Sequence, residues 1–202
     1  MKPKQDVIYY LAGEEKETLR MSPLIQKLIE KDIDVLLLDD PIDEFCIQNL
    51  GEYEKKKLKN VARGDIKFFD DDEKEKSRER KVKEAFQPLI DWWKKRLGND
   101  FDKVVVSNRL VDTPCIVVSS DFGQTANMER IQKAQAFSNP DRGQQNLLGG
   151  RKILEINTSH PAIKELLRRI KENPDVQEET NDVAQLLLES ALLASGIVYF
   201  ND

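Results

Sequence analysis

The chain has 202 residues, of which 34% are charged and 39% are hydrophobic, and its formal net charge is -5. This length allows one large domain or two small ones with a real core. The acidic balance argues against nucleic-acid binding, which depends on basic side chains that neutralise phosphates. No apolar run approaches the roughly 20 residues that span a bilayer. We therefore expect neither a nucleic-acid partner nor a membrane partner.

The chain has two cysteines and one histidine. These residues are too few for a four-ligand zinc site and cannot build a disulfide framework. We predict that Cys46 and Cys115 are free, buried thiols, because cysteine often behaves as a small hydrophobic residue. His160 precedes Pro161 at the start of a predicted helix, and we interpret it as a helix-start residue rather than a general base.

Residues 7–69 have the pattern of a small α/β unit. Strands are predicted at 7–11 and 35–38, and the second is apolar throughout, as expected for a strand covered on both faces. Between them, Ser22 and Pro23 are typical of a helix start. The strand–helix–strand order favours a parallel pair of strands.

Four carboxylates, those of Asp39, Asp40, Asp43 and Glu44, directly follow the second of these strands. Carboxylates at the carboxyl end of a parallel strand suit a divalent cation, as in magnesium-dependent phosphoryl transfer. The simpler interpretation is that Asp40 caps a helix and that the acidic residues after Pro41 lie at the positive end of its dipole. No glycine-rich phosphate loop accompanies the cluster. We favour the cap and keep a small magnesium-dependent α/β enzyme as the alternative.

The second half begins after the charged run at 70–76. A long helix is predicted over 72–97, with solvated first turns and a later apolar face. Two strands, at 101–106 and 115–119, are expected to form an antiparallel pair, with a third strand at 152–156. Thr125 or Asn127 is expected to cap a helix with an apolar stripe. The predicted fold class is α+β: a small α/β subdomain, then an α+β domain with a short three-stranded sheet and C-terminal helices.

The last predicted helix, over 182–195, is apolar around most of its circumference. One side of such a helix can face its own core, and the other side then requires a partner. Ala191, Ala194 and Ser195 are small enough to allow close approach of a second helix. An isologous dimer is the simplest closed arrangement.

Several segments resemble the ninety-kilodalton heat-shock chaperones, and in particular the branch of the endoplasmic reticulum lumen. The resemblance extends from Ile8 to Gly196 and is carried mainly by the segments at 104–110, 113–115, 127–131 and 133–136. It implies that residues 1–69 end the family's middle domain. It also implies that residues 70–202 form the C-terminal dimerisation domain without its final helix.

The resemblance also implies a function. The chain would contribute dimerisation and client-protein contacts to an ATP-dependent chaperone of the stress response. Because the family binds ATP and magnesium in a domain placed upstream, we expect no cofactor and no ATPase activity from this chain. The expected partners are a second copy of the chain and client proteins. The expected dimer contacts are Leu187, Leu188, Ala191, Leu192, Ser195 and Phe200.

The expected client contacts are Phe122, Met128, Leu147 and Leu148. The family has Tyr-Gly-Trp where this chain has Phe122-Gly123-Gln124, so the apolar surface of that turn is smaller here. The expected compartment is the endoplasmic reticulum lumen, with the cytoplasm as the alternative. The sequon that begins at Asn157 gives weak support to the lumen.

Overall fold

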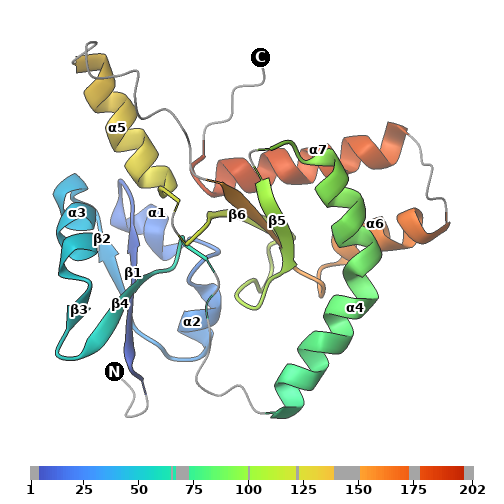
Figure 1. Ribbon diagram of the computed structural model, residues 1–202, viewed down its shortest axis with the longest axis horizontal. Helices are drawn as coiled ribbons and strands as arrows, with labels where there is room; N and C mark the ends of the chain where they lie inside the picture. The colour runs from blue at the N-terminus through green and yellow to red at the C-terminus, as the bar shows by residue number, and fades with distance from the viewer. Residues whose placement is uncertain are drawn as a thin grey trace.

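The computed structural model describes residues 5–64, 66, 73–99, 101–121, 123–138, 151–172 and 178–197. Its elements form two small sheets with helices around them, and the predicted α+β class is confirmed (Figure 1). We call residues 5–64 the first unit and residues 73–197 the second unit. No helix in the described part of the chain is long and apolar enough to cross a membrane.

The first unit contains a four-stranded sheet in the order β2-β1-β4-β3. Its central strands are β1 (Val7–Ala12) and β4 (Lys56–Asn60), with β2 (Val35–Leu38) at one edge and β3 (Glu52–Tyr53) at the other. β1 lies parallel to both β2 and β4, so the predicted parallel pair is confirmed. β3 is antiparallel to β4.

Three helices accompany this sheet: α1 (Lys16–Arg20), α2 (Gln26–Glu30) and α3 (Pro41–Leu50). The helix predicted to start at Pro23 begins three residues later, because Ser22 instead closes a local turn in which its Oγ accepts the Leu24 N–H at 3.3 Å. α3 begins as predicted. The Asp40 side chain accepts the Ile42 N–H at 3.0 Å, and Pro41 takes the first helical position.

The second unit contains a three-stranded sheet in the order β5-β7-β6. Its strands are β5 (Phe101–Val106), β6 (Cys115–Ser119) and β7 (Lys152–Ile156). The predicted direct pairing of 101–106 with 115–119 is wrong: β7 lies between them, parallel to β5 and antiparallel to β6. β7 is therefore hydrogen-bonded along both of its edges, and Leu154 and Ile156 are fully buried because both faces of the sheet are covered.

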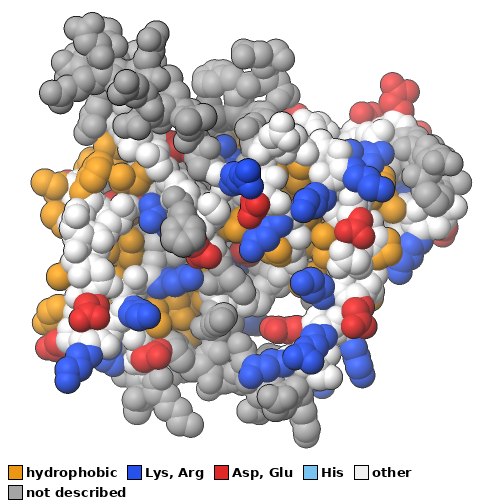
Figure 2. Space-filling view, viewed as in Figure 1, with side chains coloured by type: hydrophobic (Ala, Val, Ile, Leu, Met, Phe, Trp, Pro, Cys, Tyr) orange, Lys and Arg blue, Asp and Glu red, His pale blue; other side chains and the backbone are white. Residues whose placement is uncertain are grey.

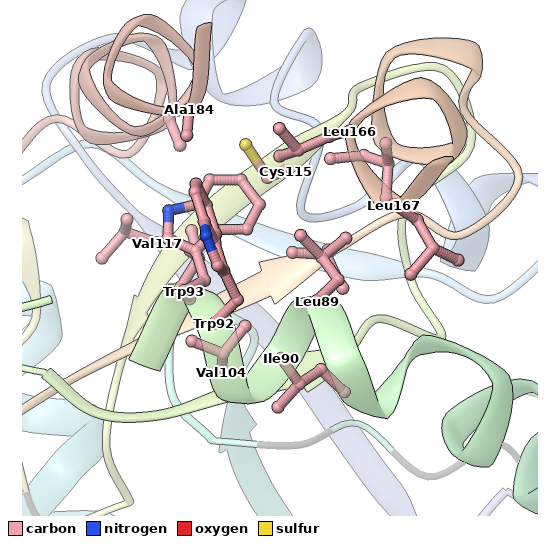
Figure 3. Packing of buried hydrophobic residues seen from close by; sticks show 14 of the residues in the cluster. Leu89, Ile90, Trp92, Trp93, Val104, Cys115, Val117, Leu166, Leu167 and Ala184 are labelled. Atoms are coloured by element: carbon pink, nitrogen blue, oxygen red, sulfur yellow. The ribbon is translucent and has the colours of Figure 1, made fainter. Parts of the chain in front are cut away.

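The described residues of the second unit also form four helices: α4 (Glu73–Arg96), α5 (Ala126–Ser138), α6 (Pro161–Glu172) and α7 (Glu178–Ala194). The long helix predicted over 72–97 is confirmed as α4. Side chains of α4, α6 and α7 form a core on one face of the sheet, and both tryptophans lie in it (Figure 3). This core includes Leu89, Trp92, Trp93, Val117, Leu154, Leu166, Ala184 and Leu192.

The other face of this sheet packs on the first unit. Ile116, Val118 and Ile153 share a buried cluster with Leu28 and Val61 of the first unit. Neighbouring positions along β6 therefore serve two different cores, as the alternation of side chains along a strand requires. The three-stranded sheet lies between the first unit and the helices of the second, so the apolar core continues from one unit into the other.

Candidate functional site

The carboxylates at 39–44 do not converge. Asp39 forms an ion pair with Lys16 at 3.1 Å, Asp40 caps α3, and the Glu44 side chain is buried at the junction of the two units. The described residues contain no group of three or more histidine, cysteine or acidic side chains placed to hold a metal ion. The magnesium-enzyme alternative therefore has no support from this cluster.

Glu44 lies on α3 and accepts hydrogen bonds from both units. Thr125 Oγ1 donates to one carboxylate oxygen at 2.6 Å, and Asn127 Nδ2 donates to the other at 2.7 Å. Within the first unit, Asn60 Nδ2 donates at 3.2 Å. The burial of Tyr10, and secondly the nearby Glu44 carboxylate, raise the pKa of the Tyr10 hydroxyl. This part of the junction is therefore a buried polar contact between α3 and the start of α5.

A second buried contact has the opposite polarity. Arg109, which is completely buried, follows β5 and forms an ion pair with Glu155 of β7 at 2.7 Å. The same guanidinium donates to the main-chain carbonyls of Val61 and Gly64 in the first unit. Ser107 Oγ donates to the second oxygen of Glu155 at 2.8 Å. An arginine of the second unit thus binds the main chain of the first. We call Arg109, its ion-pair partner Glu155 and the two carbonyls that it binds the Arg109 clamp.

The main chain itself also joins the two units. The Gly64 N–H donates to the Ser119 carbonyl at 2.9 Å, and the Ser119 N–H donates to the Ala62 carbonyl at 3.1 Å. Asn108 Nδ2 donates to the Ile66 carbonyl. The segment that leaves β4 therefore continues along the end of β6, where the Arg109 clamp also holds it.

Sequence reasoning missed these junction residues. The available signal was a charged residue among apolar neighbours, as in Leu154-Glu155-Ile156, where burial requires a partner for the charge. The partner could not be named, because Arg109 and Glu155 are brought together only by the pairing of β5 with β7. For Glu44, the sequence predicted only a place at the positive end of the helix dipole and gave no sign of its burial.

The predicted burial of the two cysteines is confirmed for one and wrong for the other. Cys115 is buried, as predicted, and this burial raises the pKa of its thiol to about 12. Cys46 is exposed, so the prediction that it is buried is wrong. It lies on the outer face of α3, close in sequence to the exposed Ile42 and Leu50. Apolar side chains gather on this side of the first unit (Figure 2).

The predicted client contacts are only partly described. Met128 lies in the first turns of α5 and is buried. Phe122, Leu147 and Leu148 fall outside the described residues. α5 itself leaves the body of the molecule beside α3 (Figure 1). Its N-terminus is capped as predicted, since Thr125 Oγ1 accepts the Met128 N–H at 3.2 Å.

The structure places the predicted dimer contacts on the inner side of α7. Ala191 and Leu192 are buried in the chain's own core, and Leu187 and Leu188 pack against it. The Ser195 hydroxyl accepts the Val117 N–H at 3.0 Å and donates to the Ala191 carbonyl at 2.6 Å. Of the small residues, Ala191 and Ser195 bring α7 close to β6, whereas Ala194 is exposed. Phe200 lies outside the described residues.

Other apolar side chains of α7 do face solvent. Val183 is 38% exposed, Leu186 is 65% exposed and Leu193 is 79% exposed. Their spacing of three and seven residues keeps them on one side of the helix. The sequence contained this stripe, but a helix that is apolar nearly all round does not reveal which side its own sheet covers.

Comparison with known proteins gives a family match over almost the whole chain. The family model described as Hsp90 protein matches residues 1–201. The chain is 43% identical to the "Endoplasmin homolog" of Arabidopsis thaliana over 199 residues, which is 98% of this chain and 23% of that protein. It is 44% identical to "Heat shock protein 90-5, chloroplastic" of Arabidopsis thaliana over 196 residues, which is 97% of this chain and 24% of that protein. The chain thus spans about a quarter of the length of these relatives.

The match corrects the expectation that this chain is not an enzyme. That expectation placed the nucleotide-binding domain outside the chain. The family model instead covers residues 1–201 as a whole, so the non-catalytic assignment is withdrawn. The match also does not show the expected position in the middle and C-terminal parts of the family's protein. One of the two relatives is named chloroplastic, so their names do not fix the compartment.

Proposed function

Since this chain belongs to the Hsp90 family of chaperones, we propose that it supports an ATP-dependent chaperone cycle by joining two copies of the protein and by contacting client proteins. The observation that carries this proposal is the exposed apolar stripe of α7, which consists of Val183, Leu186 and Leu193. We call it the α7 stripe.

The α7 stripe has the form of a helix–helix contact. Its residues lie at positions i, i+3 and i+10, and Ser190 at i+7 adds a small side chain to the same side. Full burial of one leucine side chain contributes about 1.5–3 kcal/mol, so burying these residues in two copies favours association. A two-fold axis beside α7 would pair each stripe with its own copy.

Light scattering over a dilution series tests the dimer. The wild-type chain is expected to form a dimer that dissociates on dilution, whereas Leu186→Glu and Leu193→Glu are expected to be folded monomers. Leu50→Glu is the control, since Leu50 is also a largely exposed leucine but lies on α3, and it should leave the dimer intact. A wild-type chain that stays monomeric at its highest soluble concentration would contradict the dimer proposal.

The proposed client contact is supported by apolar side chains on the outer side of the first unit. Ile42 and Leu50 on α3 are exposed, as is Tyr53 on β3. Contiguous exposed apolar surface is typical of protein-binding sites. The proposal keeps the predicted client contacts Phe122, Leu147 and Leu148. It leaves out Met128, because the side chain of Met128 is buried.

Suppression of aggregation tests the client contact. The chain is expected to slow the aggregation of thermally unfolded citrate synthase, and the double variant Ile42→Ser/Leu50→Ser is expected to slow it less. Lys94→Ser on the exposed side of α4 serves as the control. Equal protection by wild type and the double variant would remove α3 from the client contact.

The proposed cofactors of the cycle are ATP and magnesium, and the proposed compartment is the endoplasmic reticulum lumen. ATP hydrolysis is best measured for this chain and for the whole protein side by side. Activity in both would place the catalytic residues in this chain, and activity in the whole protein alone would place them elsewhere. Immunolocalisation of the untagged protein tests the compartment.

A further inference from the structure

Glu44 is a buried acidic side chain. Among the described residues, every side chain that donates a hydrogen bond to it is neutral. These donors are Gln48, Asn60, Thr125 and Asn127. A buried carboxylate is costly unless several hydrogen bonds replace its hydration. The side chain has no exposed surface, so solvent supplies none of them.

The two shortest of these hydrogen bonds come from the beginning of α5. Thr125 Oγ1 donates to Glu44 and also accepts the Met128 N–H, so one hydroxyl links the carboxylate to the first turn of the helix. Asn127 donates from the same turn. The positive end of the α5 dipole therefore faces a carboxylate, and this arrangement stabilises the start of the helix at that place.

A glutamine at this position would fill the same space, but it would not give the same contact. Its amide nitrogen would place a donor opposite the donor of either Thr125 or Asn127, which bind different oxygens of Glu44, and its neutral side chain would lose the attraction to the helix dipole. α5 also contacts the first unit through the ion pair of Arg130 with Glu14 at 2.6 Å. That pair is exposed, and pairs of this kind contribute little.

We propose that Glu44 is a positioning residue that fixes the start of α5 against α3 and thereby sets the direction in which α5 leaves the body of the protein. This inference rests on the proposed client function, because α5 leads into the segment that contains Leu147 and Leu148. Loss of the Glu44 contacts would free α5 from α3 while the cores of both units stay intact.

Hydrogen exchange followed by mass spectrometry tests this role on the full chain. In Glu44→Gln, amides of α5 over residues 126–134 are expected to exchange at least about tenfold faster, as for the loss of one hydrogen bond to a charged group. Amides of α7 and β1 should keep their wild-type rates. Glu30→Gln is the matched control, since Glu30 is an exposed partner of Lys27 in the first unit. Binding of reduced and carboxymethylated α-lactalbumin, followed by fluorescence anisotropy, gives the functional readout.

Faster exchange confined to α5, together with altered affinity for the α-lactalbumin probe, would support the proposal. Unchanged exchange in α5, or an equal increase in every helix, would overturn it. If Glu44→Gln does not fold, Asn127→Ala decides in the same way, because it removes a donor of α5 and leaves Glu44 in place. If the wild-type chain does not bind the probe, the proposed client function fails, and the exchange data alone decide whether Glu44 positions α5.

Discussion

At the scale of single residues, the two cysteines differ in the access of solvent to sulfur. The Cys115 thiol is buried and donates to the Leu187 carbonyl at 3.3 Å, and its burial raises the thiol pKa to about 12. The thiolate is the reactive form, so Cys115 should be inert at neutral pH. Cys46 lies on the outer face of α3 and lacks this protection.

We therefore predict selective alkylation of the native protein. Iodoacetamide at pH 8 should label Cys46 and leave Cys115 unmodified, as read by peptide mass spectrometry. Both should react in urea, which serves as the control for reagent and peptide recovery. Labelling of Cys115 at the rate of Cys46 in the folded protein would contradict the buried position of the thiol.

Asn157 has a structural role that accounts for its sequon without a glycan. Its side-chain amide is buried and donates to the carbonyls of Val111 at 2.8 Å and Thr113 at 3.1 Å, and its oxygen accepts the Ser159 N–H at 3.0 Å. A glycan on this nitrogen would displace those donors. The sequon is therefore no support for a secretory compartment, in contrast to the initial expectation.

The prediction for this residue uses two variants that both abolish the sequon. Asn157→Ala should lower the free energy of unfolding by about 1–3 kcal/mol, because it leaves the partly buried carbonyls of Val111 and Thr113 without this donor. Ser159→Ala keeps the Asn157 contacts and should change it by less than about 0.5 kcal/mol. Urea unfolding followed by tryptophan fluorescence measures both. If both variants lowered the free energy of unfolding equally, the loss of the sequon, which they share, would account for the effect rather than the Asn157 hydrogen bonds.

At the scale of elements, the sequence predicts a helix best when its apolar pattern allows only one face to be buried. α6 has a single apolar stripe of Ile163, Leu166, Leu167 and Ile170, and all four residues are buried. The cap of α3 and the long helix α4 are likewise local features. They depend on side chains within one or two turns, so no knowledge of distant contacts is needed.

For α7, the sequence does not predict which side of the helix faces the sheet. Its apolar residues cover most of the helix, so the pattern allows several orientations against the sheet. The structure selects the one in which Ala184 and Ala191 face the core of the second unit, and it leaves Leu186 and Leu193 outside. The order of the second sheet was unpredictable for the same reason, because pairing of β7 between β5 and β6 depends on contacts distant in sequence.

At the scale of the whole molecule, the two units are joined by a shared apolar cluster and by two buried polar contacts of opposite polarity. Glu44 accepts hydrogen bonds from the second unit, and Arg109 donates hydrogen bonds to the first. Movement of one unit relative to the other would separate buried charged groups from their partners. We therefore expect the units to unfold together and to move as one body when the α7 stripe associates.

The Arg109 clamp should dominate this coupling, because loss of one partner from a buried ion pair leaves the other charge uncompensated. Arg109→Met is expected to lower the free energy of unfolding by about 3–5 kcal/mol. The double variant Arg109→Met/Glu155→Met should lose less than the sum of the two single variants, since it removes both charges. Urea unfolding, followed in parallel by tryptophan fluorescence and far-ultraviolet circular dichroism, measures these changes and shows whether the units unfold in one transition.

Arg130→Met provides the comparison, since it removes an exposed ion pair between the same two units. It should change the free energy of unfolding by no more than about 1 kcal/mol. If the loss for Arg109→Met were equally small, the buried pair would not be holding the units together. If the two spectroscopic transitions separated in the wild-type protein, the second unit, which contains both tryptophans, would be folding independently of the first. In Arg109→Met, the two transitions could instead stay coincident and shift together to lower urea. The shared apolar cluster would then be enough to couple the units, and the clamp would add stability to the whole.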